Sequence, residues 1–331
     1  MKGNLQKEME IKKLIKLLLL QLMLVILFMP FEICSVMVPD AWDVYPEEFH
    51  KMYEKLSGYV ANGMDTDYLT CTFKGVHYEA KPIVEGMDLA YLTRKFKKDS
   101  GNEDVVGWMY IPKTNINYPV VQNTTDVSFY AKRNYEKFEN KRKEYGFPGV
   151  IWIESNNNLK NKESFSENTI FYGHNWENYT ANPKINDYRD IMFGQLASFH
   201  HFDFAKERPY IYIANEEETI PLKIIAVFYT EDEFEYYIPN PSKEEKRKII
   251  EEALLRSRFN YNSPVYLSDK IMTFSTCTRA YGKGREDQKF VIMARPLRSD
   301  ESVDDKLPED YITIHSGHKE PTLKPRKTTK K

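Results

Sequence analysis

Eight short apolar and β-branched runs, separated by turn residues, follow one another between residues 105 and 298. Runs of this length bounded by glycine, proline, asparagine and aspartate are typical of β-strands, and a succession of them favours a sheet that closes on itself. The predicted strands are Val105–Ile111, Tyr118–Val121, Val150–Glu154, Thr169–Gly173, Tyr210–Ala214, Leu222–Tyr229, Lys270–Thr276 and Phe290–Leu297. We therefore predict a mostly β fold built on an eight-stranded barrel.

Three helices are predicted outside this set of strands. Apolar residues at helical spacing predict amphipathic helices over residues 43–59 and about 86–98, both before the first strand. A third helix is expected after Ser242, which forms a capping box with Glu245 ahead of an apolar face. The barrel is thus expected to carry N-terminal helices and one inserted helix before the strand 270–276.

The two ends of the chain differ from this globular part. Three lysines at positions 12, 13 and 16 precede an apolar run over residues 17–31, a pattern that predicts a membrane anchor with the remainder of the chain outside. No small-x-small cleavage site follows, which favours an uncleaved anchor over a removed signal peptide. The last residues carry prolines, end in lysines and lack an apolar period, so we predict disorder there. The expected organisation is an anchor at 1–40, a helical region at 41–104, a barrel at 105–298 and a disordered basic tail at 299–331.

Charge and cysteine content limit the functions that are possible for this chain. The 47 lysines and arginines nearly balance 49 aspartates and glutamates, so no basic field would draw the chain to nucleic acid. No acidic or histidine cluster has metal-ligand spacing, and we expect no cofactor. The three cysteines, Cys34, Cys71 and Cys277, are too few for a disulfide framework. Because exported chains usually pair or lose their cysteines, a lone thiol needs an explanation in chemistry.

Cys277 and His174 are the candidates for that chemistry. Each directly follows a predicted strand and begins a polar loop, a position that is held by a sheet and open to substrate. The pKa of an ordinary imidazole, about 6.5, suits a general acid or base for a thiol. Position alone leaves simpler alternatives open, namely a small buried cysteine and a loop histidine bonded to the backbone.

A thiol that attacks an acyl carbon needs a group to stabilise the oxyanion that forms. A guanidinium fits this role because it is always charged and offers several donors in a fixed fork. Arg279, Arg285 and Arg295 all follow Cys277 closely, so the residues alone leave three candidates.

Two motifs carry a specific resemblance. TIFYGHN at 169–175 and TFSTCT at 273–278 are similar to the histidine and cysteine motifs of sortases, and the YGHN wording is typical of class B. The similarity continues through VVGWMYIP at 105–112, NYPVVQ at 117–122 and MFGQL at 192–196. It covers about residues 86–298, and the N-terminal helices and inserted helix also resemble class B.

The resemblance implies a sortase-type eight-stranded barrel and a catalytic set of His174, Cys277 and an arginine. The loop that follows the cysteine assigns this role to Arg285, although residues 286–289 separate that arginine from the last strand, which is a departure from the family pattern. Ser275 and Thr276, next to the cysteine, are implied as substrate-binding residues. Tryptophan at position 176 also stands where class B enzymes often have methionine.

The activity implied is that of a cysteine transpeptidase at the cell membrane, with its catalytic domain extracellular. It would cleave a C-terminal sorting motif of secreted proteins at a threonyl–glycine-like bond and transfer the acyl group to an amine of the cell-wall precursor. Three alternatives remain open: a pilin polymerase that uses a lysine amine, a secreted cysteine protease that uses water, and an inactive binding domain.

Overall fold

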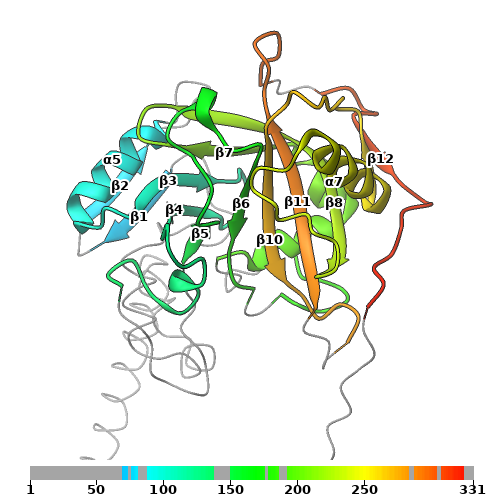
Figure 1. Ribbon diagram of the computed structural model, residues 1–331, viewed down its shortest axis with the longest axis horizontal. Coiled ribbons are helices and arrows are strands. Elements are labelled where there is room, and N and C mark those ends of the chain that lie inside the picture. The colour runs from blue at the N-terminus through cyan, green and yellow to red at the C-terminus, as the bar shows by residue number, and fades with distance from the viewer. Residues whose placement is uncertain are drawn as a thin grey trace, which may run out of the picture. The chain divides into compact units, whose positions relative to one another are not determined.

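Eight strands form a closed barrel in the order β10-β11-β8-β7-β3-β4-β5-β6 (Figure 1). The computed structural model describes residues 69–73, 76–80, 88–137, 150–175, 178–185, 192–282, 287–303 and 307–323, the first two ranges as backbone only. The barrel strands are β3 Val105–Tyr110, β4 Asn117–Val121, β5 Ile151–Ile153, β6 Asn168–Tyr172, β7 Tyr210–Ala214, β8 Thr219–Glu231, β10 Ile271–Cys277 and β11 Gln288–Pro296. The predicted barrel is confirmed, because each predicted run supplies one strand.

The barrel closes where β6 pairs in parallel with β10. Across this closure Phe171 of β6 stacks on Phe274 of β10, with ring centroids 4.8 Å apart, and both rings are fully buried. Parallel strands run in the same direction, so the carboxyl ends of β6 and β10 lie at the same edge of the barrel. The core on either side of the closure fixes where the two strands end.

Two longer helices flank the barrel. α5 (Leu89–Ser100) begins at Asp88, whose side chain accepts a hydrogen bond from the Tyr91 backbone, and ends at Gly101 in the left-handed conformation. α7 (Lys243–Arg256) begins with the predicted capping box of Ser242 and Glu245. Figure 1 shows α7 beside β8 and β11, where it packs through an apolar face. Shorter helical turns are η3 Phe129–Lys132, η4 Lys162–Ser164, η5 Gly194–His200 and α6 Phe202–Lys206.

The described residues also contain four strands that the sequence does not predict. β1 (Leu69–Phe73) and β2 (Val76–Ala80) form a hairpin, and β12 (Ile312–Ile314) pairs antiparallel with β9 (Phe259–Tyr261). The predicted helix over 43–59 lies outside the described residues.

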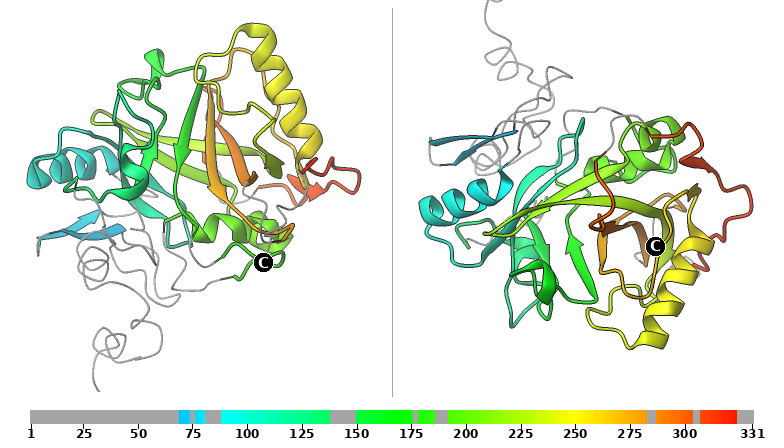
Figure 2. Two further views of the ribbon diagram at one scale, coloured as in Figure 1. Left: turned by 60° about the horizontal axis from the view of Figure 1, so that its bottom comes forward. Right: turned by 90° about the horizontal axis from the view of Figure 1, so that it is seen from above.

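The prediction of a disordered tail is wrong for residues 307–323. These residues include β12, and Figure 2 shows the segment continuing beyond it beside α7. Tyr311 and Ile312 are buried there. A three-residue strand is too short to produce an apolar period, and its partner β9 is about 50 residues earlier, so the local sequence gives no sign of the pairing.

Among the residues that the structure describes, no helix is both long and apolar enough to cross a membrane. The apolar run at 17–31, on which the predicted anchor depends, lies outside them. The anchor therefore stays a prediction.

Candidate active site

Cys277 is the last residue of β10 and is exposed, whereas the six residues before it are buried. On the neighbouring strand β11 it pairs with Lys289. Burial of the strand fixes the backbone, and the strand end leaves the thiol open to solvent. The structure thus fixes the backbone of Cys277 and leaves its thiol exposed.

His174 follows β6 by two residues and lies beside the end of β10. The last pair in the parallel register joins Tyr172 to Ser275, so His174 and Cys277 each come two positions later on their own segments. The Gly173 backbone N–H donates to the Ser275 carbonyl at an N···O distance of 3.4 Å, which continues the pairing toward both residues. The barrel closure therefore brings the two predicted catalytic residues to one edge.

Asn175 links the histidine segment to the cysteine directly. Its side-chain Nδ2 donates to the Cys277 carbonyl oxygen at 3.2 Å and to the Asn178 carbonyl oxygen at 2.8 Å. Its Oδ1 accepts from the Asn178 backbone N–H at 2.8 Å. Asn175 is buried, so these hydrogen bonds satisfy an amide that water does not reach freely. The sequence motif contains Asn175 without indicating its role, and its position after the histidine is the local signal for it.

The surroundings of His174 orient its ring. Nε2 lies 2.6 Å from the Ala131 carbonyl oxygen, and the ring centroid lies 5.6 Å from that of Trp152. A carbonyl oxygen only accepts, so Nε2 carries a proton. Burial lowers the pKa of His174, and the hydrogen bond to Ala131 partly opposes that effect. The imidazole is therefore neutral near pH 7, with Nδ1 as its basic nitrogen.

Gly173 allows the core to pack closely beneath this segment. A Cβ atom at this position would lie 2.6 Å from Cδ1 of Ile151 and 2.7 Å from the ring of Phe193, too close for carbon atoms. The Phe193 backbone N–H also donates to the His174 carbonyl oxygen at 2.9 Å. Phe193 thus fills the space beside Gly173 and also fixes the backbone of His174.

The hydroxyl groups of Ser275 and Thr276 have partners inside the protein. Ser275 Oγ lies 2.7 Å from the Tyr236 hydroxyl, and Thr276 Oγ1 donates to the Gly173 carbonyl oxygen at 2.7 Å. Both side chains are buried, at 3% and 2% exposure. These buried hydrogen bonds stabilise the end of β10. The substrate contact predicted for Ser275 and Thr276 stays a prediction.

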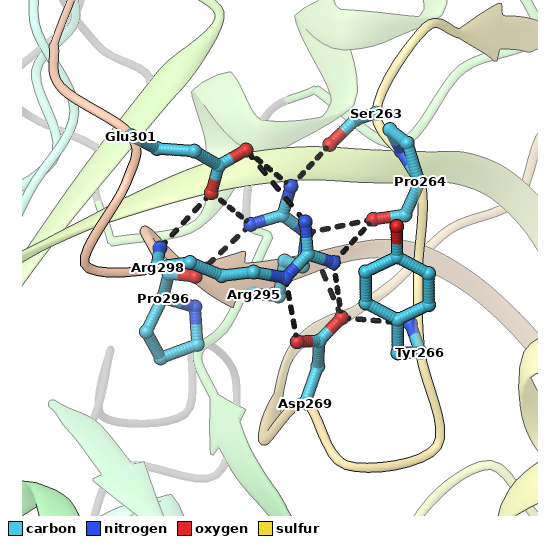
Figure 3. Close-up of polar contacts among 8 residues, drawn as sticks. All are labelled: Ser263, Pro264, Tyr266, Asp269, Arg295, Pro296, Arg298 and Glu301. Carbon is cyan, nitrogen blue, oxygen red and sulfur yellow. Dashed lines mark hydrogen bonds and ion pairs between the residues drawn. The ribbon is translucent and has the colours of Figure 1, made fainter.

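Arg295 does not belong to the same edge. It is fully buried near the far end of β11, six residues from the partner of Cys277, a separation of about 20 Å along an extended strand. Figure 3 shows its guanidinium between Glu301, Ser263 and Pro264. Two guanidinium nitrogens bind Glu301 at 2.6 and 2.7 Å, and this contact lowers the pKa of Glu301 to about 2. Of the three arginine candidates, Arg295 is thus a structural residue.

The other basic residues near Cys277 have different surroundings. Arg279 is exposed, and its guanidinium carbon lies 5.0 Å from the centre of the Tyr179 ring. Lys289, opposite Cys277, binds Asp232 at an N···O distance of 2.8 Å. Arg285 lies outside the described residues, so its assignment as the oxyanion group stays a prediction.

Comparisons with known proteins agree with this arrangement. Residues 109–297, more than half of the chain, match the model of the Sortase domain. Sortase B of Staphylococcus aureus is 29% identical over 199 residues, which span 60% of this chain and 72% of that protein. Crystallised Clostridium perfringens sortase B superposes with a TM-score of 0.50 and 25% identity, over 62% of this chain and 100% of that one. A crystal structure of sortase B complexed with Gly3 has the same TM-score, 0.50, and identity, 25%, and covers 63% of this chain and 88% of that one. The chain belongs to the sortase family, whose members are cysteine transpeptidases.

Proposed function

We propose that this chain is a class B sortase that cleaves a C-terminal sorting motif of secreted proteins and transfers the acyl group to an amine of a cell-wall precursor. The observation that carries this proposal is the parallel pairing of β6 and β10, which places His174 and Cys277 at one edge of the barrel, with Asn175 hydrogen-bonded to the Cys277 carbonyl oxygen. The class B assignment is supported by relatives named sortase B and by the inserted helix α7 between β8 and β10. We take residues 105–298 as the catalytic domain.

In the first half of the proposed reaction, His174 takes the proton of the Cys277 thiol, and the thiolate attacks the carbonyl carbon of the scissile bond. A carbon–sulfur bond forms, and the carbonyl electron pair moves to oxygen, where Arg285 stabilises it with its charged donors. The carbonyl then re-forms, the carbon–nitrogen bond breaks, and His174 delivers the proton to the departing amine. The acyl group stays on Cys277 as a thioester.

In the second half, an amine attacks the thioester. The new carbon–nitrogen bond forms, the carbon–sulfur bond breaks, and the amine proton returns by way of His174 to the sulfur. Exchange of one amide for another in two acyl transfers needs no ATP. The relative crystallised with Gly3 supports a glycine-type amine as the acceptor.

Product analysis with and without an added amine tests this function. Peptides with a threonyl–glycine bond are incubated with the enzyme and triglycine, and the products are identified by mass spectrometry. We expect a triglycine-ligated product that requires both the enzyme and the amine. Hydrolysis alone in both reactions would identify a protease, and a strong preference for a lysine amine over triglycine would identify a pilin polymerase.

We also propose that residues 17–31 anchor the enzyme in the membrane with the barrel outside, since sortase homologues are typically membrane-associated. The full-length protein should then fractionate with membranes, and protease added to intact protoplasts should digest the barrel. Val25→Arg, in the middle of the apolar run, should shift the protein to the soluble fraction, because arginine there opposes insertion. A soluble wild-type protein that begins after residue 34 would contradict the proposal.

A further inference from the structure

Residues 307–323, here called the C-terminal strap, lie beyond the part of the chain that matches the Sortase domain. The strap runs antiparallel along the end of α7 and the residues that follow it. After the pairing of β12 with β9, the His315 backbone N–H donates to the Arg258 carbonyl oxygen at 2.9 Å. The Lys319 backbone N–H donates to the Leu255 carbonyl oxygen, also at 2.9 Å. Backbone hydrogen bonds thus fix the strap in one register.

The end of the strap is fastened to the barrel itself. The Thr322 backbone N–H donates to a carboxylate oxygen of Glu231 at 3.2 Å. Glu231 also binds Arg256 through both carboxylate oxygens, at 2.7 and 2.8 Å, in a buried ion pair. On the sheet side, Glu231 pairs with Gln288, the first residue of β11. The strap therefore ends next to the point where the chain re-enters the barrel after the cysteine loop.

Glu320 lies in the chain between Lys319 and Thr322, whose backbone N–H groups are both hydrogen-bonded. It contacts the loop that follows Cys277. One carboxylate oxygen accepts a hydrogen bond from the Tyr281 hydroxyl, and the other lies 2.9 Å from Nε2 of His318. Tyr281 is four residues after Cys277. Burial and the bond to Glu320 raise the pKa of Tyr281, so its hydroxyl keeps its proton and remains a donor at physiological pH.

Tyr281 is the point at which this loop is held from several sides. Its ring meets that of Tyr229 edge to face at 5.6 Å, and its backbone N–H donates to Oε1 of Gln288 at 2.9 Å. The Gln288 side-chain nitrogen donates in turn to the Gly282 carbonyl oxygen at 2.8 Å, and Gly282 has a φ of +105°, which favours glycine. β11 thus holds the turn from one side, and the strap holds it from the other.

We propose that the C-terminal strap positions residues 278–282, which follow Cys277, for the reaction at Cys277, through the hydrogen bond between Glu320 and Tyr281. Both are positioning residues, because they act through residues 278–282, which lie between Cys277 and Arg285 in the chain. The catalytic part of this inference rests on the proposed function, whereas the ordering of the loop can be measured without turnover. If the strap only covered α7, loss of Glu320 would leave the loop unchanged.

Amide hydrogen exchange on the full-length protein in detergent tests the ordering. Tyr281→Phe keeps the ring and removes only the hydroxyl, and Glu320→Ala removes its acceptor. Each should raise the exchange rate of peptides that cover residues 278–282 about tenfold, a factor typical of losing one hydrogen bond to a charged group. Glu320→Gln keeps an acceptor oxygen and should change exchange less. Lys319→Ala is the matched control, since it removes an ion pair between the strap and Glu252 on α7 without touching the loop. Unchanged exchange in Tyr281→Phe and Glu320→Ala, or an equal rise in Lys319→Ala, overturns the proposal.

The rate of thioester formation tests the catalytic consequence. We expect kcat to fall about tenfold in Tyr281→Phe and in Glu320→Ala, with a smaller change in KM and an unchanged melting temperature. The double variant should be no slower than the slower of the two single variants, because both changes break the same contact. Faster exchange with a wild-type rate would overturn the positioning role. If the wild-type protein shows no transfer at all, the proposed function fails, while the exchange result still decides whether the strap orders the loop.

Discussion

Cys277→Ala is expected to abolish thioester formation and transfer while the protein remains folded. The thiol is the nucleophile in the proposed mechanism. Removal of the catalytic serine of a serine protease lowers kcat by about a millionfold, so we expect the activity here to fall to background. The side chain is exposed at the end of β10, so its truncation leaves no cavity in the core. Mass spectrometry of the acyl-enzyme and of the cleaved peptide measures the loss, and thermal melting checks the fold.

Cys71→Ala is the matched control for this experiment. Cys71 lies in β1, which pairs with β2 in a two-stranded sheet separate from the barrel. Its removal should leave the rate within about twofold of wild type. Retained turnover in Cys277→Ala, or loss of turnover in Cys71→Ala, would show that the nucleophile has been assigned to the wrong thiol.

The barrel could be predicted from the sequence because the pattern of each strand is local. β7 was predicted with its observed bounds, and β8 was predicted three residues short at its start, where Pro221 interrupts the apolar run. Which strands lie side by side could not be predicted in the same way. The parallel pairing of β6 with β10 joins segments about 100 residues apart, and it appears only when the barrel closes.

The same difference between local patterns and contacts between distant segments applies to the active site. His174 and Cys277 could be named because each follows a strand within a short motif. The groups that orient the histidine could not, since Ala131 and Trp152 are well separated from it in the chain. Asn175 lies next to the histidine, yet its partner, the Cys277 carbonyl, comes from the other strand.

Arg295 and the strap show the limits of local patterns most clearly. An arginine inside an apolar strand could be a catalytic group or one half of a buried ion pair. Only the position of Glu301, in the chain beyond the strand, decides between them. In the same way, the polar composition of residues 307–323 predicts disorder, while their backbone hydrogen bonds to residues 255–261 hold them in place.

Arg285→Lys is expected to lower the rate of thioester formation about a hundredfold or more without unfolding the protein. Lysine keeps the positive charge but lacks the planar fork of donors that suits an oxyanion. Loss of one oxyanion donor typically costs about 3 kcal/mol in the transition state. Steady-state rates on one sorting peptide measure the effect, and Arg285→Ala should be at least as slow.

Arg279→Ala and Lys289→Ala are the matched controls, because each removes one positive charge near Cys277. Arg279 lies against Tyr179, and Lys289 binds Asp232. We therefore expect each variant to stay within about tenfold of the wild-type rate. That loss is smaller than the loss in rate caused by removing an oxyanion donor. Arg295→Ala should act differently, by destabilising the fold by about 3–5 kcal/mol, since it leaves the Glu301 charge without its buried partner. If Arg285→Ala keeps most of its activity and Lys289→Ala loses it, the group that stabilises the oxyanion is Lys289, near the start of β11. The assignment to Arg285, which residues 286–289 separate from the last strand, would then be wrong.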